Sequence, residues 1–204
     1  MSDPANILLE KDAAANPVVQ FQRWFDDATK AGIPDANAMT LATANRAGKP
    51  SARIVLLKSF DERGFCFFTN YESEKGKQLA ENPNAALVFF WQSLHRQVRI
   101  EGVVARMTNA ESDEYFHSRP RDSQVGALVS PQSCVIPGRE FLDERFRQLS
   151  ERYKGTVVPR PEHWGGYRLA PHTIEFWQGR ENRLHDRLVY RKADDGWKIE
   201  RLAP

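Results

Sequence analysis

The spacing of apolar residues along the chain predicts a few amphipathic helices among a larger number of short strands. Near the N-terminus, Phe21, Trp24 and Ala28 recur at the three- and four-residue spacing of a buried helix face. Asn16 stands where an N-cap is needed and Gly32 where the helix should stop. We expect this first helix to pack against the core.

Nine further runs predict strands, because they are rich in β-branched and aromatic residues and are bounded by turn sequences such as NRAGKP and DERG. Short turns between consecutive strands favour an antiparallel sheet. The runs are AMTLATA, SARIVLLKSF, GFCFFTN, AALVFFW, RQVRIEGVVARM, GGYRLAP, TIEFWQG, LHDRLVYRK and WKIERLAP.

Further helices interrupt the strand pattern. SEKGKQLAENP predicts a short helix that begins after Ser73 and ends before Pro83, and Thr108 with Glu111 forms the pattern of a capping box. GREFLDERFRQLSERYK predicts an amphipathic helix. Eight or nine strands without regular βαβ alternation indicate an α+β protein with a closed or nearly closed antiparallel barrel.

Composition narrows the class of protein. The chain has 204 residues, of which 41% are hydrophobic, and a formal net charge of +2 without a basic stripe. A chain of this length is expected to form one domain. The balanced charge argues against a nucleic-acid partner. No run approaches the ~18 apolar residues of a membrane span, so no membrane partner is expected. The two cysteines and five histidines show no metal-ligand spacing, so no metal is expected. The N-terminal sequence lacks a secretory pattern, which favours a cytoplasmic location.

Familiar glycine-rich phosphate loops and hydrolase motifs are absent from the sequence, so a bound phosphate would need cationic side chains. Arg53 and Lys58 stand at the two ends of one apolar strand, where a separation of five places them on opposite faces. They are candidates for an anion site, and strand-end charges are the alternative.

A denser group surrounds Pro120. Tyr115, Arg119, Arg121 and Ser123 lie within nine residues, and Ser123 could cap a following helix. Hydroxyls, arginines and a helix N-terminus suit a phosphate dianion. A helix–helix junction with solvated arginines explains the same residues equally well.

A third group lies near the C-terminus. In a strand, Arg183, His185 and Arg187 would share one face, while Trp177 precedes them and could stack on a planar ligand. A cationic face of this kind predicts an anion site. The alternatives are a solvated strand face for the charged residues and a core position for the tryptophan.

Several stretches together resemble the pyridoxine/pyridoxamine 5′-phosphate oxidase family. They run in order over residues 21–204, and SRPRDSQ with RLHDR is specific to this oxidase within its superfamily. The other stretches are RIVLLK, FFTNYESEKGKQLAENP, RQVRIEG, ALVSPQS, HWGGYRL, IEFWQGREN and WKIERLAP.

The resemblance implies an FMN-binding split β-barrel with surrounding helices, formed by residues 16–204 after a flexible segment at 1–15. It implies a homodimer with the flavin at the subunit interface. The FMN contacts it implies are Arg53, Ile54, Val55, Leu56, Leu57, Lys58, Phe68, Thr69, Lys75, Gln97, Gln132, Ser133, Trp177 and Arg187.

The resemblance also implies the substrate contacts Lys58, Tyr115, Arg119 and Ser123 for the phosphate, with Arg183 and His185 as catalytic residues at the reactive side of the pyridine ring. The implied reaction oxidises pyridoxine 5′-phosphate or pyridoxamine 5′-phosphate to pyridoxal 5′-phosphate. A hydride passes to FMN, and dioxygen is reduced to hydrogen peroxide.

The sequence departs from the family pattern in two places. Glu74 stands before Lys75 where the family often has an arginine, and the N-terminus lacks an Arg-x-x-Tyr segment that covers substrate in some members. Glu74 either opposes the flavin phosphate or turns outward to pair with Lys77 or Gln78. Two rival functions remain, a flavin oxidase of phenazine biosynthesis and a noncatalytic flavin or pyridoxal-phosphate carrier.

Overall fold

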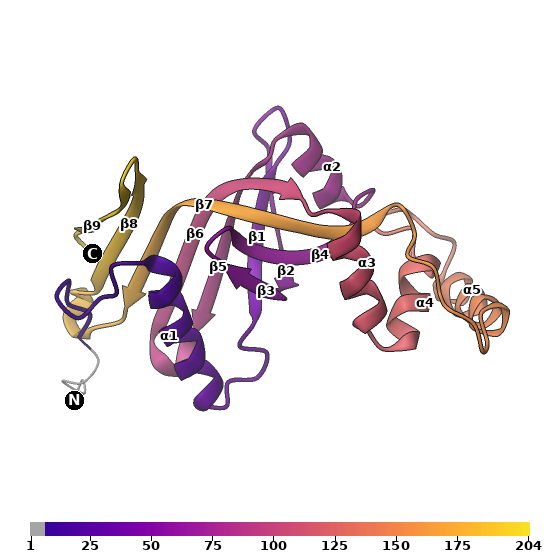
Figure 1. Ribbon diagram of the computed structural model, residues 1–204, viewed down its shortest axis with the longest axis horizontal. Coiled ribbons are helices and arrows are strands. Elements are labelled where there is room, and N and C mark those ends of the chain that lie inside the picture. Colours follow the sequence, from indigo (N-terminus) through magenta and orange to yellow (C-terminus); the bar gives the residue numbers. More distant parts are fainter. Residues whose placement is uncertain (1–6) are drawn as a thin grey trace.

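The computed structural model describes residues 7–204 and shows one nine-stranded antiparallel sheet that curls into a half-barrel (Figure 1). The path β2-β1-β5-β6-β7-β4-β3 forms its main part, and β8 and β9 extend it from β7. The strands are β1 (Ala38–Ala44), β2 (Pro50–Leu56), β3 (Ser59–Asp61), β4 (Gly64–Asn70), β5 (Asn84–Trp91), β6 (Arg96–Arg106), β7 (Trp164–Gln178), β8 (Asp186–Ala193) and β9 (Gly196–Arg201).

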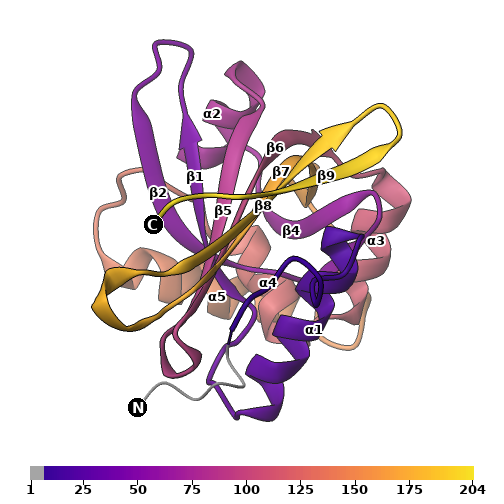
Figure 2. The same cartoon turned by 90° about the vertical axis from the view of Figure 1, so that its left-hand side faces the viewer.

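Five α-helices surround the sheet, and the predicted α+β class with an antiparallel split barrel is confirmed. Figure 2 looks from the β8–β9 end, with that hairpin in front and α3, α4 and α5 behind. Two short 3₁₀ turns precede β6 and β8. The helices are α1 (Pro17–Lys30), α2 (Glu74–Glu81), α3 (Asn109–Ser118), α4 (Arg121–Val129) and α5 (Arg139–Arg152), and the turns are Gln92–Leu94 and Glu181–Arg183.

Three of the predicted helix starts are confirmed. The Asn16 side chain accepts a hydrogen bond from the Val18 amide at 2.8 Å, and the Ser73 hydroxyl accepts one from the Gly76 amide at 3.3 Å. Thr108 begins α3 with the full capping box. Each cap satisfies an amide that the first helical turn cannot pair internally.

Helix α1 closes the barrel interior. Its Phe21 is fully buried and packs edge-on against Phe65 and Phe89 from the sheet, with ring centroids 5.0 Å away in both cases. Trp24 packs in the same manner against Phe176 at 5.2 Å. Burial of these large rings stabilises the contact between helix and sheet.

One continuous strand, β7, replaces the two strands predicted for GGYRLAP and TIEFWQG. Pro171 lies inside it, opposite Gly102, where the register with β6 shifts. A proline is tolerated at such a bulge because its missing N–H is not needed there. A Cβ at Gly102 would meet the Ala170 carbonyl oxygen at 2.2 Å, so this crossing requires glycine.

The segment before α1 lies against the C-terminal hairpin. Tyr190 donates its hydroxyl to the Ala14 carbonyl at 2.8 Å, and Arg201 donates to the Glu10 carboxylate at 2.8 Å. Residues 1–6 lie outside the described part of the chain, and flexibility over residues 1–15 stays a prediction.

Candidate active site

Strand β2 and helix α2 bring two cations together. Arg53 donates from Nη1 to the Thr43 hydroxyl at 2.5 Å, while Lys75 donates from Nζ to Gln132 Oε1 at 2.7 Å and to Thr69 Oγ1 at 3.3 Å. Burial lowers the pKa of both groups, and the charge of Arg53 lowers that of Lys75 further. An anion bound between them would relieve both effects. We call these two residues the Arg53–Lys75 pair.

The apolar residues after Arg53 alternate between outward-facing and core-facing positions. Ile54 and Leu56 point outward and are 65% and 39% exposed. Val55 packs against the core and Leu57 is buried within it. A ligand at this strand could therefore contact only backbone groups of Leu57.

Arg119, at the end of α3, forms the second cationic site. Its Nη2 donates to the Ser123 carbonyl at 2.7 Å, and the guanidinium carbon lies 4.6 Å from the centroid of the Trp164 ring. Burial lowers its pKa, and its Nη1 is buried without a hydrogen-bond partner within residues 7–204. A buried donor of this kind is costly until it meets an acceptor, so the geometry favours an anionic ligand.

One prediction about this segment is wrong, and for Arg121 the structure shows the alternative of a helix–helix junction. Pro120, not Ser123, holds the cap position of α4, and Ser123 lies within the first turn. Arg121 donates to the carbonyls of Thr156 and Tyr153, so it belongs to the junction with α5 and not to the site. The predicted proximity of Ser123 to Arg119 is confirmed.

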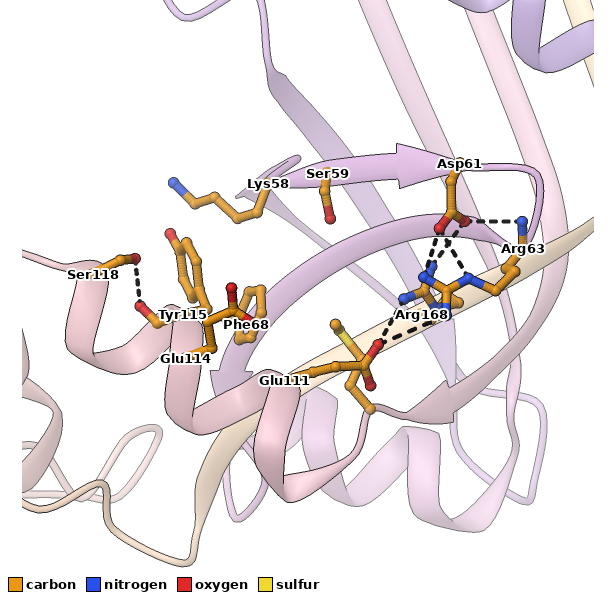
Figure 3. A pocket seen from close by; sticks show the side chains of 11 residues that line it. Lys58, Ser59, Asp61, Arg63, Phe68, Glu111, Glu114, Tyr115, Ser118 and Arg168 are labelled. Atoms are coloured by element: carbon orange, nitrogen blue, oxygen red, sulfur yellow. Dashed lines mark hydrogen bonds and ion pairs between the residues drawn. The ribbon is translucent and has the colours of Figure 1, made fainter.

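A cavity of about 400 Å³ opens between β3 and α3 (Figure 3). Lys58 and Tyr115 face one another across one end of it, with Nζ 5.9 Å from the ring centroid. At the other end Arg168 donates to Asp61 at 2.9 Å and to Glu111 at 3.1 Å. Because Arg168 is already paired with these carboxylates, Lys58 is the cation in this cavity that could bind an anionic ligand. Because β2 ends at Leu56, Lys58 does not share a strand with Arg53, and the prediction of opposite strand faces does not apply.

Strand β4 places the two cationic sites side by side. The ring of Phe68 stacks on Tyr115 at 3.9 Å and on Trp164 at 5.6 Å. The next residue, Thr69, donates its hydroxyl to Gln132 at 3.2 Å on the side of Lys75. Successive strand residues point to opposite faces, so one short segment serves both sites. Ser133, the residue after Gln132, lies in an exposed turn and has a positive φ of 71°.

The predicted strand through Arg183, His185 and Arg187 is wrong in its first half. Strand β8 begins at Asp186, and the residues before it form a tight turn in which φ is 56° at Asn182 and 60° at Arg183. Arg183 and His185 therefore project from a turn, and only Arg187 lies on the strand. Left-handed backbone at two consecutive residues ends any strand alternation.

This turn holds His185 in a defined orientation. The Arg180 amide donates to Nδ1 of His185 at 3.0 Å, and the imidazole lies 4.6 Å from the Trp177 ring. Since Nδ1 accepts a hydrogen bond, the neutral ring carries its proton on Nε2. The group that can act on a ligand is thus a single N–H donor.

Arg187 is already paired within the chain. Its Nε donates to Glu175 Oε1 at 2.7 Å, and Arg99 donates to the other oxygen at 3.1 Å. The bond to Glu175 raises the pKa of Arg187. Sequence analysis missed Glu175, although a carboxylate inside the apolar run TIEFW signals a buried partner. Gln97 and Arg187 lie beside Trp177 on the neighbouring strands.

The residues at the far end of β7 lie far along that strand from Phe68 and the Arg119 site beside it. Phe68 pairs with Gly166 near the start of β7, whereas Gln97 and Arg187 pair with Trp177 near its end. Eleven residue steps of ~3.3 Å correspond to about 36 Å along the strand. Figure 1 shows the same separation, with α3 and β8 at opposite ends of β7. We call Gln97, Trp177, His185 and Arg187 the strand-end group.

Glu74 pairs with Gln78, as in the second of its two predicted arrangements, but it stays near Arg53. Its Oε1 accepts a hydrogen bond from Gln78 Nε2 at 3.0 Å. Its negative charge also raises the pKa of Arg53, against the larger effect of burial. Glu74, which replaces the arginine common in the family, is therefore one of the groups that surround Arg53.

Over residues 7–204, no cluster of three or more histidine, cysteine, aspartate or glutamate side chains is placed to hold a metal ion. Within the same residues, no helix has the length and apolar character needed to cross a membrane.

Comparison with curated proteins shows close relatives. The pyridoxine/pyridoxamine 5′-phosphate oxidase of Bordetella pertussis is 59% identical over 199 residues, covering 97% of this chain and 94% of the relative. Pyridoxine/pyridoxamine 5′-phosphate oxidase 1, chloroplastic, of Arabidopsis thaliana is 56% identical over 202 residues. This second match covers 97% of the chain but 38% of the plant protein, so the chain spans well under half of that relative.

Among solved structures, PhzG from Burkholderia lata 383, in complex with tetrahydrophenazine-1-carboxylic acid, superposes with a TM-score of 0.92. It is 32% identical, and the match covers 98% of each chain. A pyridoxamine 5′-phosphate oxidase-related, FMN-binding protein from Nostoc punctiforme shares the fold, with a TM-score of 0.75 at 17% identity over 90% of this chain and 97% of that one.

Family models cover the chain from the first helix to the C-terminus. The model described as pyridoxamine 5′-phosphate oxidase matches residues 25–163, and the one described as the pyridoxine 5′-phosphate oxidase C-terminal dimerisation region matches residues 164–204. The chain therefore belongs to the pyridoxamine 5′-phosphate oxidase family.

Proposed function

We propose that this protein is an FMN-dependent oxidase that converts pyridoxine 5′-phosphate or pyridoxamine 5′-phosphate to pyridoxal 5′-phosphate. The observation that carries the proposal is a pair of cationic sites on the two sides of β4, one for each of two phosphates. The names of the close relatives support the same activity.

The Arg53–Lys75 pair suits the flavin phosphate. Burial destabilises both cations, and the groups that accept their hydrogen bonds are neutral hydroxyl, amide and carbonyl groups. A dianion would form charge-assisted hydrogen bonds with both. Riboflavin lacks this group and should bind more weakly.

The second site suits the substrate phosphate. Arg119 offers the buried, unpartnered Nη1, and Ser123 lies beside it. Lys58 and Tyr115 line the adjoining cavity and face one another across it. A planar pyridine ring next to Phe68 would then lie between the two phosphate sites.

A second copy of the chain would complete the site. The strand-end group is about 36 Å along β7 from Phe68, so it could meet the flavin only from a partner subunit. The outer face of the sheet presents Ile54 at 65% and Phe90 at 59% exposure, an apolar surface suited to a homodimer. The match to a dimerisation region supports this arrangement.

The protein residues would bind, orient and shield the substrate. FMN, when bound, would supply the acceptor for a hydride from the substrate carbon, with dioxygen as the final electron acceptor and hydrogen peroxide as its product. Residues that anchor the two phosphates would keep the reacting rings close together, which is a proximity effect. Arg183 and the Nε2–H of His185 would hold the oxygen or nitrogen of the substrate and guide its proton away.

Turnover with phosphorylated and unphosphorylated substrates tests the proposal. The protein loaded with FMN should form the aldehyde and hydrogen peroxide in equal amounts from pyridoxamine 5′-phosphate. With pyridoxamine the value of kcat/KM should fall at least about a hundredfold, since an interaction of about 3 kcal/mol is lost. A phenazine oxidase would show no such dependence on phosphate, and a carrier would show no turnover.

A further inference from the structure

A chain of four polar side chains leads from Arg53 to Glu74 between β1, β2 and α2. Arg53 Nη1 donates to Thr43 Oγ1 at 2.5 Å, and Thr43 Oγ1 donates to Gln78 Oε1 at 2.5 Å. Gln78 Nε2 then donates to Glu74 Oε1 at 3.0 Å. Thr43 and Gln78 are only 3% and 5% exposed, so the middle of the chain is shielded from water.

All three bonds point in the same direction, from the cation to the carboxylate. The amide of Gln78 is fixed in this sense, because its oxygen also faces Arg53 Nη2 at 3.4 Å and its nitrogen also donates to Ser51 Oγ at 3.2 Å. A reversed amide would set its N–H groups against the guanidinium. Aligned hydrogen bonds polarise one another in a medium of low dielectric constant.

We propose that Thr43, Gln78 and Glu74 are positioning residues that fix the guanidinium of Arg53 for the flavin phosphate. The inference rests on the proposed function, since it assigns the phosphate of FMN to Arg53. The guanidinium of Arg53 is held by this row of hydrogen bonds and by the Leu41 carbonyl at 3.2 Å, so its side chain has lost conformational freedom before the ligand binds. Preorganisation of this kind strengthens binding because less entropy is lost on association.

The proposal gives Glu74 a favourable role in spite of its charge. If Glu74 acted only through space on the phosphate, its removal would strengthen FMN binding. If Glu74 instead acts as the last acceptor in this row of hydrogen bonds, its removal leaves Ser51 as the one acceptor for Gln78 Nε2. Arg53 is then held less firmly, so FMN binding weakens. The two accounts therefore predict opposite signs.

The experiment measures dissociation constants of FMN and riboflavin for the flavin-free full chain by quenching of flavin fluorescence. Thr43→Val removes the central hydroxyl with little change in volume, and Thr43→Ser restores it. We expect Thr43→Val to weaken FMN about tenfold and Thr43→Ser to stay within about twofold of wild type. Riboflavin binding should be unchanged in both, which a general loss of structure would not produce.

Glu74→Ala provides a second, exposed position that does not threaten folding. It should weaken FMN about threefold, while Glu72→Ala, an equal change of charge two residues away, leaves it unchanged. Tighter FMN binding by Glu74→Ala, or unchanged FMN binding by Thr43→Val, would overturn the inference. The proposed function would still stand if the wild-type protein binds FMN more tightly than riboflavin. Equal wild-type affinities for the two flavins would overturn both.

Discussion

Replacement of Lys75 by methionine separates two effects of this cation. Methionine keeps much of the apolar stem and removes the ammonium group that donates to Gln132 at 2.7 Å. In the flavin-bound protein the lost group is a partner of the phosphate. In the flavin-free protein it is a charge disfavoured by burial and by Arg53. Binding and stability should therefore respond differently.

The magnitude for binding follows from one charge-assisted hydrogen bond. Such bonds are worth about 1.5–3 kcal/mol, which corresponds to a dissociation constant for FMN raised roughly 10- to 150-fold. The flavin-free variant loses neutral hydrogen bonds but also an unfavourable charge. We expect its melting temperature to lie within about 4 °C of wild type, the range for a change of about 1 kcal/mol.

The stability difference should also depend on pH. The folded-state pKa of Lys75 lies below its ordinary value of 10.5. The charged form is thus disfavoured by folding, and this cost is fully present below the folded-state pKa and disappears as the pH rises to 10.5. Flavin-free wild type should gain stability relative to Lys75→Met across that window.

Fluorescence titration with FMN and riboflavin, together with thermal melts of the flavin-free proteins, checks these expectations. Lys75→Arg serves as the control, because it keeps a cation at the same position. Unchanged affinity of Lys75→Met for FMN would refute the assignment of Lys75 to the phosphate. Equal weakening of riboflavin and FMN would show that the substitution disturbs the fold and not the phosphate site.

Three further predictions concern the substrate site, the turn and the dimer. Arg119→Ala should raise KM for pyridoxamine 5′-phosphate about a hundredfold and leave the dissociation constant of FMN unchanged; a matching loss of FMN would argue against separate phosphate sites. Arg183→Ala and His185→Ala should lower kcat while flavin absorbance stays at about one per chain, and loss of flavin in both folded variants would contradict their placement at the substrate. Phe90→Glu together with Ile54→Glu should give monomers by light scattering with weaker flavin binding, and a fully active monomer would exclude a shared site.

Sequence patterns predicted the elements whose signals are local. Asn16, Ser73 and the Thr108–Glu111 box mark helix starts because their side chains bond amides two or three residues away. The turn before β8 was not predictable in the same way. The run LHDRLVYRK suggested a strand from Leu184, but Leu184 is 69% exposed and the turn depends on left-handed backbone at Asn182.

Long-range contacts set the limit for the candidate site. Lys75 and Gln132 are 57 residues apart in sequence, and their hydrogen bond depends on how the loop after α4 returns to β4. No spacing rule relates them, so only the family resemblance paired them in advance. The chain through Thr43 and Gln78 escaped the sequence analysis because a buried glutamine is visible only once its neighbours are known.

A dimer with different substitutions in its two subunits gives the most direct test that two copies share each site. Arg53→Ala and Arg187→Ala would be coexpressed with different affinity tags, purified through both tags, and assayed for oxidation of pyridoxamine 5′-phosphate at limiting FMN. If the two arginines of one site come from different subunits, each mixed dimer has one intact site and should show about half of wild-type activity, while either variant alone is nearly inactive. Activity of the mixed dimer no higher than that of the single variants would contradict the account.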